Sequence, residues 1–250
     1  MTEKPTLVAH RGLAARWPEN TLPALAAAVA AGARWVEVDV QLCADRTPVL
    51  LHDADLQRVA GRPDLVFDLP AATLADIPVG EPERLGERFP DARAPTLAAF
   101  AHWLAGTDGV SAFVELKTES IARFGRGVVL DACMAAMAPA KGRWAPISYD
   151  AELLALAGAA GAARLGWVVR GFDAEIEACA RALPAGWLFC NHTRLPPGPL
   201  PAGPWEWVLY EVDDAALANR LMARGARWLE TMAIDSLQVA VGGKPPGDGR

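Results

Sequence analysis

Short apolar runs alternate with alanine-rich segments along most of the chain. The short runs are rich in Val, Leu and Trp, which favours the strands of a parallel sheet that is covered on both faces. The segments that fit this pattern are Leu7–His10, Trp35–Gln41, Pro48–His52, Val110–Lys117, Ala145–Tyr149, Arg164–Val169, Trp187–Asn191, Trp205–Val212 and Arg227–Thr231.

Helices are predicted between these strands. The first begins at Thr21, a residue type that caps helices, and ends at Gly32. Others are expected over residues 95–106, 124–138, 151–160, 173–182 and 214–224. Regular β/α alternation predicts a parallel sheet with helices outside. If Pro48–His52 is an extra hairpin arm, eight strands remain, so we expect a single (β/α)₈ TIM-type barrel; an open doubly wound sheet is the alternative.

The domain organisation predicted from the 250 residues is one barrel over residues 1–241. Residues 53–95 are rich in Pro, Asp and Gly and are expected to form a loop-rich insertion after the second strand. The Gly/Pro-rich tail, residues 242–250, is predicted to be disordered.

Composition narrows the class of protein. The chain is 52% hydrophobic, enough for a full core, and its net charge of −6 with no run of Lys or Arg argues against a nucleic-acid-binding surface. The negative net charge does not exclude a small anionic substrate, because such a substrate responds to the local electrostatic field of its binding site rather than to the net charge of the chain. The scattered cysteines Cys43, Cys133, Cys179 and Cys190 are interpreted as buried free thiols. Without a signal-peptide pattern or an apolar spanning run, we expect a cytoplasmic protein with no membrane anchor.

Polar residues follow several of the apolar strands. His10 and Arg11 come directly after Leu7–Ala9, and His52 and Asp53 follow Leu50–Leu51. In a (β/α)₈ barrel the carboxyl ends of the strands carry the active site. A single histidine in such a place is more often structural, so neither pair decides the function alone.

Carboxylates interrupt two other strands. Side chains alternate along a strand, so Glu37, Asp39 and Gln41 share one face, and Glu115 shares a face with Lys117. A solvated edge strand or a local ion pair would also explain these patterns. In a covered parallel sheet, however, two neighbouring carboxylates point into a confined space, where a bound cation or a raised pKa would relieve their repulsion.

Taken in order, these motifs resemble the glycerophosphodiester phosphodiesterases, and the resemblance is closest to compact cytoplasmic bacterial members and extends over nearly the whole chain. The matching words are His10-Arg11-Gly12, Pro18-Glu19-Asn20-Thr21, Glu37-Val38-Asp39, His52-Asp53, Glu115-Leu116-Lys117, Ile147–Leu154 and Val208–Asp214. The chain departs from the family pattern in Glu211 and Asp213, which replace Thr and Asn, in Met232, which replaces Asp, and in Arg46, which replaces Gly.

The resemblance implies a divalent cation, Mg²⁺ or Ca²⁺, held by Glu37, Asp39 and Glu115. All-oxygen ligands suit such hard ions. It also implies metal-dependent hydrolysis of a small glycerophosphodiester to glycerol 3-phosphate and an alcohol. His10 and His52 would be the acid–base pair, with their individual roles unassigned and with either water or the glycerol 2-hydroxyl as nucleophile.

Further residues are candidates for substrate contacts. Arg11 and Lys117 would contact the phosphate. Trp167, Tyr210 and His192 are candidates for the pocket wall, with ordinary core packing as the alternative for the two aromatic residues.

Two other functions compete with this hypothesis. Hydrolysis of lysophospholipids in the manner of a lysophospholipase D would need an apolar groove, for which Leu65, Val66, Phe67 and Leu69 in the insertion are candidates. A non-catalytic barrel that binds a phosphate metabolite would lack a ligand or a histidine, and none is missing here. Oligomeric state is not predicted.

Overall fold

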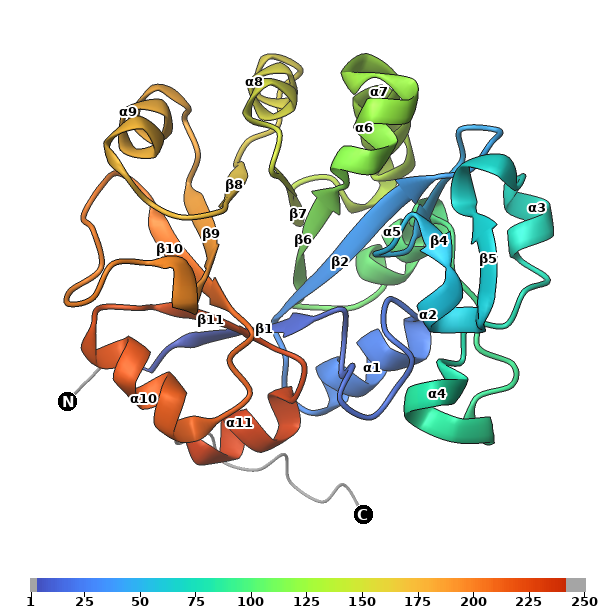
Figure 1. The fold of residues 1–250 in the computed structure, drawn as a ribbon, viewed down its shortest axis with the longest axis horizontal. Coiled ribbons are helices and arrows are strands. Elements are labelled where there is room, and N and C mark those ends of the chain that lie inside the picture. The colour runs from blue at the N-terminus through green and yellow to red at the C-terminus, as the bar shows by residue number, and fades with distance from the viewer. Residues whose placement is uncertain (1–3, 242–250) are drawn as a thin grey trace.

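The computed structural model describes residues 4–241, which form a closed barrel of eight parallel strands with helices outside (Figure 1). The barrel strands are β1 (Thr6–His10), β2 (Trp35–Leu42), β6 (Ser111–Leu116), β7 (Trp144–Ser148), β8 (Gly166–Val169), β9 (Trp187–Asn191), β10 (Glu206–Tyr210) and β11 (Trp228–Thr231). Because β1 pairs with both β2 and β11, the sheet has no open edge between its first and last strands. The predicted barrel is confirmed, and the open sheet is excluded.

One further strand belongs to this sheet but not to the barrel. β3 (Pro48–Leu50) pairs antiparallel with the end of β2, as expected for a hairpin arm. It carries the chain to His52 beside the barrel mouth.

Helices connect the barrel strands. The longer ones are α1 (Leu22–Ala30), α5 (Leu97–Ala105), α6 (Thr118–Phe124), α7 (Arg126–Ala136), α8 (Ala151–Ala159), α9 (Ala174–Ala182), α10 (Ala215–Ala223) and α11 (Ile234–Ala240). Thr21 caps α1 as predicted, since its hydroxyl accepts from the Ala24 amide at 3.3 Å. Short 3₁₀ turns occur at Val66–Asp68, Gly86–Arg88, Ala138–Ala140 and His192–Arg194.

The prediction of one helix over residues 124–138 was wrong in its start. Two helices, α6 and α7, meet at Gly125, whose φ of 89° ends α6. Glycine adopts this conformation without the steric penalty of a Cβ atom.

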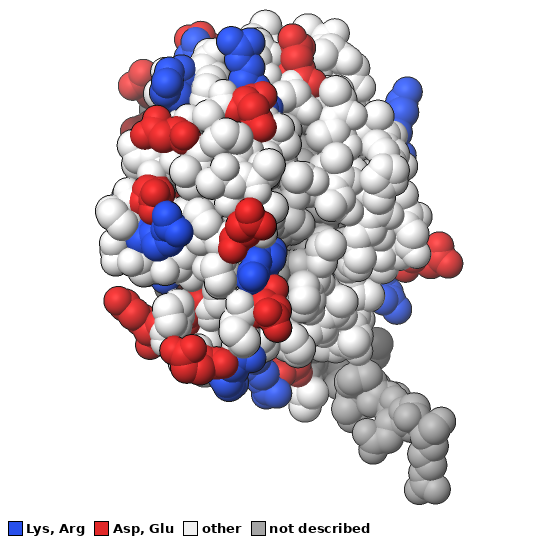
Figure 2. Space-filling view, turned by 90° about the vertical axis from the view of Figure 1, so that its right-hand side faces the viewer, with Lys and Arg blue, Asp and Glu red and all other residues white. Residues whose placement is uncertain are grey.

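The segment 53–95 is more ordered than the expected loop-rich insertion. It contains β4 (Asp55–Leu56), α2 (Gln57–Ala60), β5 (Arg62–Leu65), α3 (Ala71–Leu74) and α4 (Pro82–Leu85), which lie at one side of the barrel (Figure 1). Leu56, Val66 and Leu74 are fully buried in a small hydrophobic cluster of their own. On this side of the molecule, acidic and basic side chains are interspersed (Figure 2).

Alternation along the strands divides the core into two layers. Val36, Val38 and Val40 face the surrounding helices, whereas the other face of β2 points into the barrel. Four aromatic side chains pack against one another at the amino-terminal end of the interior: Trp35, Phe113, Trp187 and Trp228. This apolar plug leaves the carboxyl-terminal end to polar residues.

All four cysteines are free, but the prediction that all are buried was wrong for one of them. Cys43, Cys133 and Cys190 are buried, and Cys179 on α9 is exposed. Among the described residues, no helix is long and apolar enough to cross a membrane. The predicted disordered tail lies outside the described residues.

Candidate active site

A polar cavity of about 350 Å³ opens at the carboxyl ends of the barrel strands. This volume is in the usual range for small-molecule sites. Most of its lining is polar or charged, and the residues are His10, Arg11, Glu37, His52, Glu115, Lys117, Thr118, Glu119, Ile147, Tyr149, Val168, Arg170, Phe189, Asn191, Arg194, Tyr210, Glu211 and Glu230. Both predicted catalytic histidines therefore face one cavity.

Glu37, Asp39 and Glu115 come together through the pairing of β2 with β6. The parallel register sets Asp39 opposite Glu115, and Glu37 lies two residues earlier on the same face of β2. One carboxylate oxygen from each lies within 4.8 Å of the others. The three predicted ligands thus form a geometry that could hold a metal ion.

Asp39 is held as a charged carboxylate by its neighbours. Its oxygens lie 3.0 Å from Arg11 Nε and 3.3 Å from Lys117 Nζ, and the Asn20 side-chain amide donates to it at 3.0 Å. Although burial opposes ionisation, Arg11 and Lys117 hold the pKa of Asp39 far below its usual range. Asp39 is therefore a fixed negative charge.

Glu37 and Glu115 lack comparable compensation. Neither oxygen of buried Glu37 has a hydrogen-bond partner, nor does Glu115 Oε1, although that atom lies 3.0 Å from Lys117 Nζ. Burial raises the pKa of both carboxyls, and the nearby negative charge of Asp39 adds to this. For Glu115 the positive charge of Lys117 opposes the rise without cancelling it. Both oxygens of Glu37 are buried without a partner beside two further carboxylates, and a hard divalent cation would compensate them, so the residues present fit such an ion.

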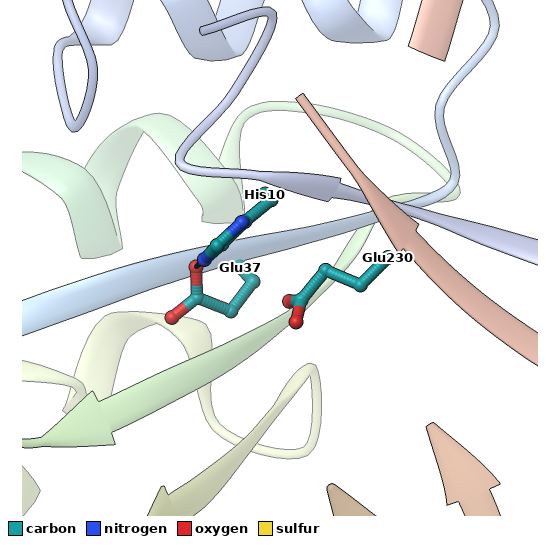
Figure 3. Close-up of side chains that lie close together, drawn as sticks. All are labelled: His10, Glu37 and Glu230. Carbon is teal, nitrogen blue, oxygen red and sulfur yellow. Dashed lines mark ion pairs between the residues drawn. The ribbon is translucent and has the colours of Figure 1, made fainter. Parts of the chain in front are cut away.

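Glu230, which the sequence analysis did not single out, lies in the same cavity. It stands on β11 opposite Val8 of β1 and is only 3% exposed. Figure 3 shows its carboxylate near that of Glu37 and the ring of His10. Burial, together with the charges of Asp39 and Glu115, raises the pKa of Glu230 well above its usual value. Its strand position could have revealed it: an acidic residue between Leu229 and Thr231 in an apolar strand is the same signal as Glu37 in β2.

His10 ends β1 and is almost fully buried. Its Nε2 lies 3.9 Å from Glu37 Oε2, and its Nδ1 has no hydrogen-bond partner. Burial, reinforced by the charge of Arg11, lowers the pKa of His10 well below its ordinary value. The imidazole is therefore neutral near pH 7 in this environment and able to accept a proton.

His52 lies in the loop that follows β3, and Asp53 orients its ring. Its Nδ1 lies 2.7 Å from Asp53 Oδ1, and the Gln41 side-chain amide donates to its carbonyl at 3.1 Å. The hydrogen bond from His52, and then the charge of Arg58, hold the pKa of Asp53 down at about 2. His52 therefore presents Nε2 with its other ring nitrogen already engaged.

Arg58, on α2 of the insertion, holds Asp53 and Glu19 in place by hydrogen bonds. The Arg58 guanidinium donates from Nε to Asp53 at 2.8 Å and from both terminal nitrogens to Glu19 at 2.8 Å. Glu19 also accepts from Arg11 Nη1 at 3.1 Å. A continuous chain of ion pairs therefore links the loops after β1 and β3.

The predicted pocket wall is only partly present. Tyr210 lines the cavity, and its hydroxyl lies 3.1 Å from that of Tyr149. Trp167 instead points outward into the barrel–helix layer, where its Nε1 donates to the Tyr149 carbonyl at 3.3 Å. Alternation along β8 places Val168, and not Trp167, in the cavity lining. His192 begins a 3₁₀ turn and is not among the residues that line the cavity.

Comparison with known proteins shows what the segment that carries this site is similar to. Residues 10–128, which carry the HRG, PENT, ExD, HD and ExK motifs, match the model of the glycerophosphoryl diester phosphodiesterase family. The match covers just under half of the chain and shows that this part of the chain is similar to that family. All seven residues predicted for catalysis, phosphate contact and metal binding lie within the matched segment.

Relatives named as glycerophosphodiester phosphodiesterases match part of the chain. The chain is 36% identical over 95 residues to glycerophosphodiester phosphodiesterase 1 of Rattus norvegicus. This alignment covers 38% of this chain and 29% of the rat protein. The chain is 35% identical over 94 residues to a glycerophosphodiester phosphodiesterase of Caldanaerobacter subterraneus, covering 38% of each. The aligned part thus spans less than two fifths of these relatives.

Solved structures share the whole fold of this chain. A phosphodiesterase of Oleispira antarctica, determined in complex with the product sn-glycerol-3-phosphate, aligns over 95% of this chain and 97% of its own with a TM-score of 0.82 and 23% identity. A glycerophosphodiester phosphodiesterase of Thermotoga maritima aligns over 94% and 98% with a TM-score of 0.70 and 18% identity. At these identities the likeness establishes the barrel fold.

Proposed function

We propose that this chain hydrolyses small glycerophosphodiesters to glycerol 3-phosphate and an alcohol, with a divalent cation at Glu37, Asp39 and Glu115. The observation that carries the proposal is the convergence of His10, His52 and these carboxylates on one cavity. The match of residues 10–128 to the family model and the sn-glycerol-3-phosphate bound to the Oleispira antarctica phosphodiesterase support the substrate class.

Glu37, Asp39 and Glu115 would hold Mg²⁺ or Ca²⁺, because all three offer carboxylate oxygens and no softer ligand. When bound, the cation would neutralise charge that develops on the phosphate oxygens. Asp39 contributes a charge that stays fixed, whereas both oxygens of Glu37 lack hydrogen-bond partners and are free to turn toward the ion. Glu115 pairs with Lys117 at 3.0 Å and would share its carboxylate between that lysine and the ion.

Arg11 and Lys117 supply positive charge at the same place. Both side chains are mostly buried, line the cavity and pair with Asp39. Burial in a low-dielectric site strengthens their attraction for a phosphodiester anion. Arg11 is further fixed by Glu19, so its guanidinium is oriented before the substrate arrives.

His10 and His52 would divide the proton transfers between them. One ring would take the proton of the nucleophile, either water or the glycerol 2-hydroxyl, and the other would give a proton to the oxygen of the departing alcohol. Asp53 keeps the His52 ring in a single orientation through the 2.7 Å contact. His10 is held by its strand and its burial rather than by an acidic partner on Nδ1.

The structure gives no support for a lipid groove formed by the insertion. Val66 is fully buried, Phe67 packs against Phe124 with ring centroids 5.9 Å apart, and neither lines the cavity. Of the four candidate apolar residues, Leu65 alone has an exposed side chain. A water-soluble alcohol is therefore the preferred leaving group.

The experiment that tests this function is release of glycerol 3-phosphate from glycerophosphocholine in the presence of Mg²⁺ or Ca²⁺. His10→Ala and His52→Ala should each lower kcat by about 10²–10⁴-fold, the usual contribution of general acid–base catalysis. His102→Ala is the matched control, since His102 lies exposed on α5 outside the cavity. Wild-type rates for either site variant, with the fold verified by circular dichroism, would refute the assignment.

A further inference from the structure

The barrel interior contains a second group of side chains suited to a cation, on the other side of Glu37 from Asp39 and Glu115. One ligand atom each from His10, Glu37 and Glu230 lies within 4.8 Å of the others. The three side chains come from β1, β2 and β11, which are neighbours around the barrel, and they converge on one point (Figure 3).

The strongest indication of a ligand in this second group is the environment of Glu230. Only 3% of the surface of Glu230 is exposed to solvent, and its Oε1 has no hydrogen-bond partner. Burying a carboxylate without a partner is costly unless an ion or donor compensates it. None of the ion pairs formed among the described residues includes Glu230, whereas Asp39 of the first group has Arg11 and Lys117.

Glu37 can serve both groups. It is 2% exposed, and both of its carboxylate oxygens are without hydrogen-bond partners. A carboxylate has two oxygens, so one can turn toward Asp39 and Glu115 while the other turns toward His10 and Glu230. Ligands around a small divalent ion stand closer together than 4.8 Å, and rotations of the two flexible Glu side chains would close that gap.

We propose that His10, Glu37 and Glu230 form a second cation site, selective for a borderline ion such as Zn²⁺, and that filling it inhibits the enzyme. An imidazole with two carboxylates is a ligand set that suits zinc, unlike the all-oxygen first site. Inhibition follows because a ring nitrogen bound to an ion has no lone pair left for proton transfer. The inhibitory part rests on the proposed function of His10, whereas binding does not.

Zn²⁺ binding measured by calorimetry in saturating Mg²⁺ tests the site independently of turnover. The full chain carries Cys179→Ser in every sample, which removes the exposed thiol as a competing ligand. One Zn²⁺ should bind per chain without releasing Mg²⁺, and Glu230→Gln should weaken it at least tenfold. Glu119→Gln is the matched control, because Glu119 lines the same cavity outside both groups and should leave Zn²⁺ affinity unchanged.

Turnover of glycerophosphocholine at rising Zn²⁺ supplies the second measurement. Inhibition should follow occupancy, and Glu230→Gln should shift the inhibitory concentration by the same factor as the dissociation constant. Equal Zn²⁺ affinity in the wild type and in Glu230→Gln, or one-for-one displacement of Mg²⁺, would overturn the second site. Zn²⁺ binding through Glu230 in a chain without Mg²⁺-dependent turnover would instead refute the proposed function alone.

Discussion

Glu230 shows at the scale of one residue what the sequence could and could not reveal. Alternation predicted that Glu37 shares a face with Asp39 and Glu115 with Lys117, because the first two lie on β2 and Lys117 directly follows Glu115 and Leu116 at the end of β6. The approach of Glu230 to Glu37 depends instead on the pairing of β11 with β1, and then of β1 with β2. Strand register across the barrel closure is a property of the fold, so no local pattern gives this contact.

Removing the Glu230 carboxylate should stabilise the chain when no metal is present. The raised pKa means that the folded chain keeps a proton that the unfolded chain loses above about pH 4.5. Stability from this group therefore falls as pH rises from 4.5 toward the folded-state pKa, by up to about 1.4 kcal/mol per pH unit.

We expect the advantage of Glu230→Gln over the wild type to grow with pH in that window. Chemical denaturation at several pH values in chelator measures it, with Glu119→Gln as the control. An advantage that shrinks with rising pH would contradict the environment described for Glu230.

Asp53 is expected to position His52 rather than to touch the substrate. Asp53→Asn removes the charged acceptor from His52 Nδ1, where the contact is 2.7 Å. We expect kcat for glycerophosphocholine to fall at least tenfold with KM little changed, because orientation and protonation of the ring matter most in the transition state.

Steady-state kinetics over a range of pH checks this expectation, and the pH profile should change as well as the rate. Asp64→Asn is the control, since Asp64 pairs with Arg62 on the surface of the insertion. A variant that altered KM alone would place Asp53 in substrate binding instead.

At the scale of elements, the sequence predicted the strands well because apolar runs bounded by polar ends are a strong signal in a parallel barrel. Trp187–Asn191 was predicted with both ends as observed. The insertion was predicted poorly, since elements such as β5 and α3 are only four residues long. Short elements depend on tertiary packing, here around Leu56 and Leu74, more than on local propensity.

The turn between β1 and α1 should be intolerant of a side chain at Gly12. Its φ is +87°, and a Cβ atom there would lie 2.7 Å from the Ala24 carbonyl carbon. We expect Gly12→Ala to lower the free energy of unfolding by about 2 kcal/mol or more, from backbone strain and overpacking together.

Urea denaturation measures this loss, and Gly127→Ala in α7 serves as the control. No atom lies within 4 Å of a Cβ at Gly127, so that variant should gain about 0.5–1 kcal/mol from better helix propensity. Equal stability of the two variants would show that the β1–α1 turn is not constrained.

At the scale of the whole molecule, the aromatic plug closes one end of the barrel and the polar cavity opens at the other. This polarity follows from parallel strands, all of which end at the same face. Sequence motifs scattered from His10 to Lys117 therefore meet in space without any local signal of their contact. The late strands contribute Tyr210 and Glu230, which the amino-terminal motifs do not include.

Metal-dependent release of glycerol 3-phosphate from glycerophosphocholine tests the central claim most directly. The account predicts turnover with Mg²⁺ or Ca²⁺, loss of turnover in EDTA, and recovery when either ion is restored. Glu37→Gln should raise the ion concentration needed for half-maximal rate at least tenfold, whereas Glu119→Gln should not. Full activity of the metal-free chain, or no release of glycerol 3-phosphate under any of these conditions, would contradict the account.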